Sequence, residues 1–135
     1  MGCSATGTQN LSGTRLPFSS DWTEVFGFSW ERMLFTGYKI TVGSNAQYLS
    51  AFNTSATENP TANFGPIWLL GANMGVLSES NNWRVELSGR NLLNVHYITI
   101  GFDRPGSPAG ATDIYGPINR PREIWLQLTK NFGNR

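Results

Sequence analysis

Ionisable and phenolic side chains gather in one polar segment, between residues 93 and 121. In sequence order the candidates for contact with a ligand are His96, Asp103, Arg104, Asp113 and Tyr115. A pair of carboxylates at the right spacing can act as general acid and base, and a histidine can bind a metal or a substrate. A lone histidine is more often structural, and loops are polar because water solvates them. These residues are therefore weak candidates for ligand contact from a loop.

Nothing else in the sequence indicates catalysis. Cys3 is the single cysteine and lies far along the chain from His96, the single histidine. There is no Gly-x-Ser-x-Gly elbow, no glycine-rich phosphate loop and no metal-ligand spacing. Asp103 and Asp113 could pair as acid and base, but two aspartates in one loop are a weak signal. We predict a protein that is not an enzyme and that holds neither a metal nor a cofactor.

Composition narrows the class of protein further. Of the 135 residues, 14% are charged, which is well below the roughly 25% of a soluble globular protein, and 13% are aromatic. The chain has ten basic and nine acidic residues, and it has no basic run that could neutralise a series of phosphates. Nucleic acid is therefore not an expected partner. The low charge suits a protein whose outer surface is not all exposed to water.

Hydrophobic and polar residues alternate in five windows, which predicts five β-strands. These strands must position the polar segments that connect them. The windows cover residues 22–31, 38–48, 67–77, 83–88 and 123–132. In the clearest one, Ile40 and Val42 share one face while Lys39 and Thr41 share the other. In the third window apolar residues occur on both faces, so the phase of that strand stays open.

The connections between these windows alternate in length. Residues 35–37 and 78–82 form hairpin-sized turns, whereas residues 50–66 and 93–121 form long polar segments. Outer-membrane barrels have this asymmetry, with tight periplasmic turns and long outer loops. Alternating strands also build soluble β-sandwiches, so alternation alone leaves both architectures open.

Aromatic residues gather at the ends of the predicted strands. Tyr38 and Tyr48 are about ten steps of roughly 3.3 Å apart, which at a tilt of about 45° spans some 23 Å. That length is close to the ~25 Å apolar band of a membrane barrel, whose two boundaries carry aromatic girdles. The spacing favours a membrane barrel over a sandwich, which does not require aromatic residues at both strand ends.

Two segments near the C-terminus resemble the closing strands of TonB-dependent outer-membrane receptors. The run from Trp83 to Tyr97, WRVELSGRNLLNVHY, resembles the penultimate strand of that family, and the run from Pro121 to Phe132, PREIWLQLTKNF, resembles its final strand. The residues that carry the resemblance are Asn91, Leu92, Asn94, Tyr97, Pro121, Arg122 and Phe132. Residues 11–17, LSGTRLP, resemble the lead into an earlier descending strand more loosely.

The resemblance implies an all-β fold, an antiparallel transmembrane β-barrel segment with about five C-terminal strands of a roughly 22-stranded barrel. Residues 1–135 would be a single segment of the barrel domain, and the plug domain would lie outside it. The full-length protein would take up a ferric siderophore or a similar nutrient across the bacterial outer membrane, with the TonB system acting through the plug. The expected partners are outer-membrane lipid, the nutrient ligand and the barrel assembly machinery, which in this family recognises a terminal aromatic residue such as Phe132.

Two alternatives remain at the level of sequence. The first is a soluble β-sandwich that binds a ligand or a carbohydrate, with the aromatic residues in a core or a groove. The second is a small independent barrel, although five windows fall short of the minimum of eight strands. The first twenty residues lack the basic start and apolar core of a signal peptide, so we expect an exported protein to be represented here by a fragment.

Overall fold

The structure is a computed structural model that describes residues 12–13, 15–35, 37–78, 82–104 and 113–132. The chain divides into two compact units. The sheet unit comprises residues 24–48, 68–95 and 120–135, and the loop unit comprises residues 1–23, 49–67 and 96–119. Among the residues described, no helix is long and apolar enough to span a membrane.

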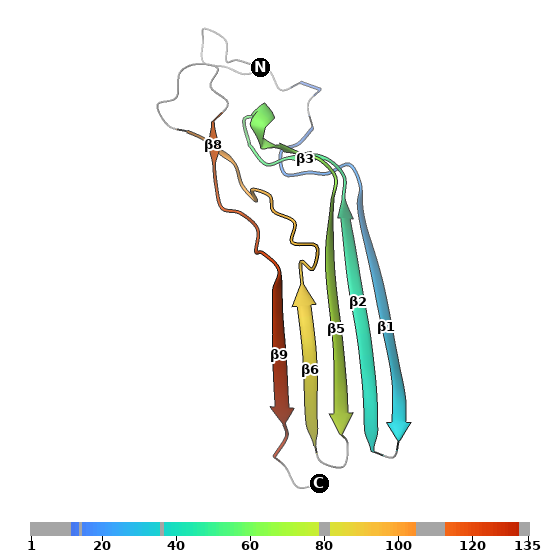
Figure 1. Ribbon diagram of the computed structural model, residues 1–135. Helices are drawn as coiled ribbons and strands as arrows, with labels where there is room; N and C mark the ends of the chain where they lie inside the picture. The colour runs from blue at the N-terminus through green and yellow to red at the C-terminus, as the bar shows by residue number, and fades with distance from the viewer. Residues whose placement is uncertain (1–11, 14, 36, 79–81, 105–112, 133–135) are drawn as a thin grey trace. The chain divides into compact units, whose positions relative to one another are not determined.

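The sheet unit is built on five long strands that follow one another in space as they do along the chain, in the order β1-β2-β5-β6-β9. Figure 1 shows neighbouring strands running in opposite directions, as an up-and-down antiparallel ribbon. The strands are β1 (Thr23–Phe35), β2 (Tyr38–Leu49), β5 (Ile67–Ser78), β6 (Trp83–Arg90) and β9 (Glu123–Lys130). The five predicted windows and the all-β antiparallel fold class are confirmed.

The pairing register assigns the faces of the last three strands. Met74 lies opposite Leu87, which lies opposite Leu126, so one face carries an apolar row across three strands. One step along, Glu86 lies between Gly75 and Gln127 on the other face. The phase of the third predicted strand, which the sequence left open, is therefore the one with Met74 on the apolar face.

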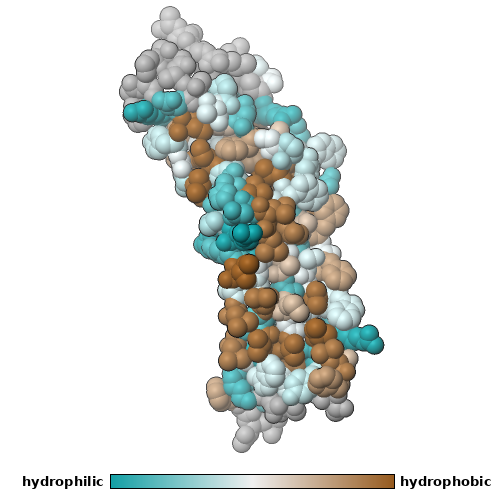
Figure 2. Space-filling model, in the orientation of Figure 1, coloured by the Kyte–Doolittle hydropathy of each residue, from teal (hydrophilic) through white to brown (hydrophobic). Residues whose placement is uncertain are grey.

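The apolar face of the sheet is not covered within this unit. The buried apolar side chains among the described residues are Phe52 and Ala62, and both belong to the loop unit. By contrast, Leu126 and Leu128 on β9 are 71% and 72% exposed. Figure 2 shows apolar residues gathered over the strands of the sheet. The sheet is one layer thick and has no hydrophobic core of its own among the described residues.

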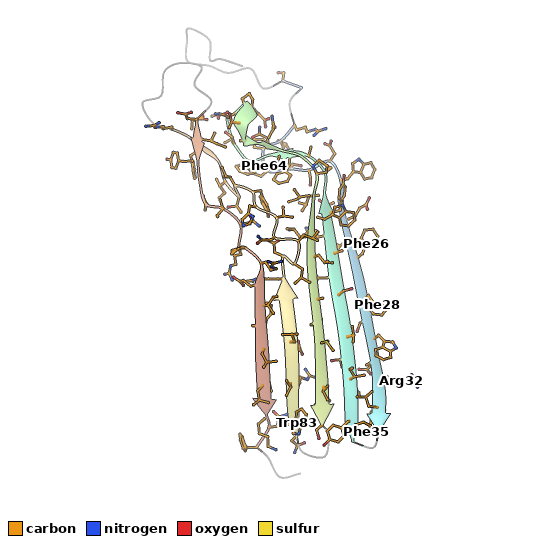
Figure 3. The ribbon with its side chains drawn as sticks, in the orientation of Figure 1. Phe26, Phe28, Arg32, Phe35, Phe64 and Trp83 are labelled. Atoms are coloured by element: carbon orange, nitrogen blue, oxygen red, sulfur yellow. The ribbon has the colours of Figure 1, made fainter. Side chains whose placement is uncertain are left out.

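Aromatic side chains contact one another near both ends of the long strands. At one end the ring centroid of Tyr38 lies 5.1 Å from that of Phe35 and 6.2 Å from that of Trp83. Near the other end, Tyr48 and Trp68 lie 5.0 Å apart. Figure 3 shows Phe35 and Trp83 near the same end of the sheet. These contacts lie near the strand ends, where the sequence predicts that aromatic residues gather.

The long connections are more ordered than the sequence suggested, because each contains short paired strands. In the first, β3 (Phe52–Asn53) pairs with β4 (Asn63–Phe64), and the 3-10 helix η1 (Pro60–Ala62) lies between them. In the second, β7 (Phe102–Asp103) pairs with β8 (Ile114–Tyr115). An isolated parallel bridge between Ser55 and Gly101 joins the two connections. Alternation could not reveal strands of two residues, because they are shorter than one period of the pattern.

Candidate functional site

The end of β6 is fixed by Asn91, a residue of the family motif. Its backbone φ is +47°, a left-handed conformation that asparagine tolerates better than most residues. The side-chain Nδ2 donates to the carbonyl oxygens of Val95 and Arg120, each at 2.9 Å, and Oδ1 accepts from the Val95 amide at 3.0 Å. Asn91 is 9% exposed. Asn91 thus ends β6 and holds the turn that follows.

Asn94 completes a connection between the end of β6 and the start of β9. It also has a positive φ, of +53°, and its Oδ1 accepts from the Arg122 amide at 3.0 Å. Beside it, the Nε of Arg90 donates to Oε2 of Glu123 at 2.6 Å within an ion pair. We name Arg90, Asn91, Asn94, Arg122 and Glu123 the β6–β9 clasp. The motif residues that the sequence singled out are thus brought together to close a turn.

The other motif residues have separate surroundings. The Leu92 amide donates to the Leu70 carbonyl at 2.8 Å, and its side chain covers Gly89, where an added Cβ would lie 2.7 Å from Leu92 Cδ2. Pro121 is exposed ahead of β9, and Phe132 is 91% exposed just after it. Tyr97 belongs to the loop unit, where it contacts aromatic rings. Three of the seven motif residues therefore form one structural cluster, and the other four lie outside it.

In the loop unit, Asp103 connects segments that are far apart in sequence. Its Oδ1 accepts from Asn59 Nδ2 at 2.8 Å, and its Oδ2 accepts from Thr57 Oγ1 at 2.7 Å. Because both bonds favour the charged carboxylate, the hydrogen bond from Asn59 and then that from Thr57 lower the pKa of Asp103 below its ordinary 3.8. Asp103 therefore acts as a charged acceptor that ties the two long connections together.

The partners of Asp103 are themselves held in a hydrogen-bonded cluster. Asn53 donates from Nδ2 to the Asn59 carbonyl at 3.0 Å, and its Oδ1 accepts from the Ser55 amide at 2.7 Å. Asn59 caps η1 by accepting from the Thr61 amide at 3.0 Å. We name Asn53, Ser55, Thr57, Asn59 and Asp103 the polar knot. Asn53, Ser55 and Asn59 are buried, and their hydrogen bonds satisfy polar groups that would otherwise be costly to bury.

The remaining loop candidates do not form a catalytic arrangement. Arg104 and Asp113 form an exposed ion pair at 3.5 Å, so the carboxylates of Asp103 and Asp113 have different partners. Tyr115 packs on Phe102 with ring centroids 5.6 Å apart, and His96 is exposed. Within the part of the chain that the structure describes, no three His, Cys, Asp or Glu residues are grouped as a metal site. Sequence reasoning identified Asp103, but not the asparagine and threonine residues that bind it.

A small aromatic cluster forms beside the polar knot. Phe52 lies 5.9 Å from Phe64 and 5.7 Å from Tyr97 between ring centroids, and Phe64 lies 6.2 Å from Tyr97. Figure 3 labels Phe64 in this region. A pocket of about 200 Å³ opens next to the cluster, and Phe52, Tyr97 and Phe18 are among the residues that line it. No pattern in the sequence indicated this pocket, because its walls come from three separate segments.

The sheet unit carries a larger, purely apolar depression on its apolar face. Its volume is about 350 Å³, and small residues such as Ser44, Ala72 and Gly89 lie among larger ones such as Phe28 and Leu87. On the other face, glycine residues make room for asparagine side chains. A Cβ at Gly43 would lie 2.5 Å from Asn73 Oδ1, for example. The two faces therefore differ in shape as well as in polarity.

Comparisons of the chain with protein-family models, with curated protein sequences and with solved structures found no match. The functional interpretation therefore depends on the geometry of the two units and on the residues of the motif.

Proposed function

We propose that this chain is the C-terminal part of the β-barrel of a TonB-dependent outer-membrane receptor. The observation that carries the proposal is the single-layer sheet, whose apolar face is exposed across adjacent strands. Exposed apolar patches on soluble monomers rarely exceed a few hundred Å². A lipid bilayer satisfies such a face without a second protein layer, which is the arrangement of a barrel wall.

The distribution of charge supports the same orientation. Lys39 and Glu31 approach within 3.6 Å, and Arg90 pairs with Glu123, both on the face opposite the apolar rows. A polar interior is what outer-membrane barrels present to their lumen. On the apolar face, Lys130 lies at the end of β9 opposite Trp83. A long basic side chain at that position can extend toward the polar boundary of a membrane.

The two edges of the sheet are evidence that it forms part of a larger sheet. The sheet ends at β1 on one side and β9 on the other, and each edge strand has backbone groups that face no partner strand within the sheet. In hydrocarbon every such group must be paired, so five strands require further strands to close a barrel. A soluble sandwich would instead require a second sheet against the apolar face, and the described residues of the sheet unit supply none.

In the proposed receptor this chain supplies wall, outer loops and the closing strand. The short turns would face the periplasm and the long connections would face outward. Phe132 would lie at the end of the chain that the assembly machinery recognises. The full-length protein would bind a ferric siderophore or similar nutrient with its loops and plug. TonB would then pull on the plug to admit the nutrient. Cells that make only these 135 residues should show no uptake that depends on the proton gradient.

The test begins with the full reading frame that contains this chain, expressed with its export signal in cells that have an outer membrane. The protein should fractionate with the outer membrane and resist extraction by alkaline carbonate. Recovery as a detergent-free soluble monomer would reject the proposal and favour the sandwich. This fractionation separates the two architectures whatever the transported nutrient is.

Cysteine labelling in the same cells then tests the assignment of the faces. In a Cys3→Ser background, Leu126→Cys should react with a bilayer-soluble reagent and not with a water-soluble maleimide. Gln127→Cys, one residue along β9 on the other face, is the matched control and should react with the maleimide. A reversed result would mean that the apolar face does not contact lipid.

A further inference from the structure

Phe18 has a backbone conformation that glycine normally adopts. The Ser19 amide donates to the Leu16 carbonyl at 3.3 Å, which closes a turn with Pro17 second and Phe18 third. The φ of Phe18 is +63°, whereas a turn with proline second and a positive φ third favours glycine at the third position. The Phe18 amide is held by the Asn53 carbonyl at 2.7 Å. The sequence thus retains a large aromatic side chain at a strained position.

Contact with other aromatic rings does not account for this phenylalanine. Its side chain is 51% exposed, and among the described residues its ring contacts no other aromatic ring. Strained residues often lie at binding sites, where the strain serves the ligand. Phe18 lines the pocket of about 200 Å³ in the loop unit. The exposed part of the ring is therefore available to a ligand in that pocket.

The walls of the pocket combine aromatic rings with hydroxyl groups. Its hydroxyl-bearing residues are Ser20, Thr54, Tyr97 and Thr99, and Phe52 lies beside them. Apart from the phenol of Tyr97, no lining side chain is ionisable. A charged ligand would lose water there without gaining an ion partner, so the pocket favours a neutral one. Its volume is below the 300 to 1,000 Å³ that is roughly typical of sites for drug-sized ligands, and it suits a single ring.

The hydrogen-bonding roles of these hydroxyls are partly fixed. Thr99 Oγ1 donates to the Pro117 carbonyl at 3.1 Å, and Thr54 Oγ1 donates to the Ala62 carbonyl at 3.5 Å. The Thr99 oxygen is then left as an acceptor for a ligand, whereas the Thr54 hydroxyl is buried within the unit. Within the described residues the phenol of Tyr97 has no hydrogen-bond partner, so it can both donate and accept. Acceptors and a donor around aromatic faces match the hydroxyls and C–H faces of a sugar ring.

We propose that this pocket, which we name the hydroxyl pocket, binds one ring of a neutral polyhydroxylated compound. The ring would stack on Phe18, while Thr99 and Tyr97 hydrogen-bond its hydroxyls. This site stands independently of the membrane proposal, because all its residues belong to the loop unit. A soluble protein with the same loop unit would bind the same compound, so either proposal can fail alone.

Saturation-transfer NMR on the full chain, with D-glucose as the probe, tests the site. The chain should be kept in a zwitterionic detergent without a sugar headgroup, so that the detergent does not compete. D-glucose should give a saturable signal. D-glucuronate tests the exclusion of charge, and cyclohexylmethanol tests the need for several hydroxyls. Absence of saturable D-glucose binding, or equal binding of all three probes, would overturn the proposal.

Substitutions locate the binding and separate it from folding. Phe18→Gly removes the ring and relieves the backbone, so it should weaken D-glucose binding about threefold or more while leaving urea unfolding no easier. Tyr97→Phe should weaken binding by about threefold to tenfold through the loss of one neutral hydrogen bond. Tyr115→Phe, in the same unit but outside the pocket, is the matched control and should bind unchanged. If Phe18→Gly unfolds the chain or binds normally, the ring has no ligand role and the proposal fails.

Free sugars and the headgroups of glycolipids share this chemistry. Methyl β-D-glucoside and hexyl β-D-glucoside, both below micelle-forming concentration, distinguish the two sources. Equal affinity indicates a free sugar, and tighter binding of the hexyl compound indicates a glycolipid headgroup.

Discussion

In the sheet unit long apolar side chains lie at the surface, whereas in the loop unit several polar side chains are almost completely buried. Leu126 is 71% exposed, while Thr54 and Ser55 are each 1% exposed. The sheet is held by ladders of backbone hydrogen bonds between long strands. The loop unit is held by side-chain hydrogen bonds around Asn59 and Asp103 and by three aromatic rings. The described residues leave the apolar face of the sheet uncovered, whereas the loop unit supplies its own interior.

The largest expected effect comes from placing a charge on the exposed apolar face. If the proposed barrel is correct, Leu126→Arg should destabilise the protein in lipid vesicles by about 2 to 4 kcal/mol, the cost of an arginine on the lipid face near the midplane of a barrel. Gln127→Arg, on the opposite face, should change the free energy of unfolding by much less. Urea titration of the vesicle-inserted protein measures both. Equal effects would remove the distinction between the faces.

A smaller loss of stability is expected at the β6–β9 clasp. Asn91→Ala removes three hydrogen bonds at the turn after β6, which should cost about 1 to 3 kcal/mol. Asn91→Asp keeps the acceptor for the Val95 amide and a residue suited to positive φ, so its loss should be intermediate. Denaturant unfolding measures the series. An unchanged midpoint for Asn91→Ala would mean that the clasp does not hold the two strands.

The stability of the polar knot should depend on pH through Asp103. The stability of the sheet should not depend on the titration of Asp103. Because hydrogen bonds lower the folded-state pKa of Asp103 below 3.8, its stabilising effect is present above that value. The effect is lost as the pH falls through the lower folded-state pKa. Hydrogen exchange at the Gly101 amide, which donates to the Thr54 carbonyl at 2.6 Å, should therefore accelerate in strong acid beyond its intrinsic trend. Asp103→Asn should abolish that acceleration, and Asp113→Asn should retain it. Acceleration that persists in Asp103→Asn would assign the pH response to another group.

The smallest effect is expected at the surface of the loop unit. Arg104 and Asp113 are 70% and 61% exposed and lie 3.5 Å apart, so solvent screens their attraction. Arg104→Gln should change the free energy of unfolding by less than about 0.5 kcal/mol. A loss comparable to that of Asn91→Ala would show that the ion pair belongs to the structural part of the unit.

More of the sheet unit than of the loop unit could be predicted from the sequence, and the reason is physical. Alternation located all five long strands, since each is several periods long. The third strand was ambiguous because Leu77 and other apolar residues lie on its polar face, where Leu77 pairs with Arg84. The clasp was missed because Asn91 and its partner Arg120 are far apart along the chain and become neighbours only when β9 pairs with β6.

By itself the sequence determined the strands, their order along the chain and the faces of four of them, because these depend on residues close together in the chain. The tertiary structure decided the phase of β5, the polar knot and the hydroxyl pocket. Each of these joins residues from separate segments, as when Thr57 and Asn59 meet Asp103. In that example β5 and β6 separate the contacting residues along the chain, so no local pattern of residue types records the contact.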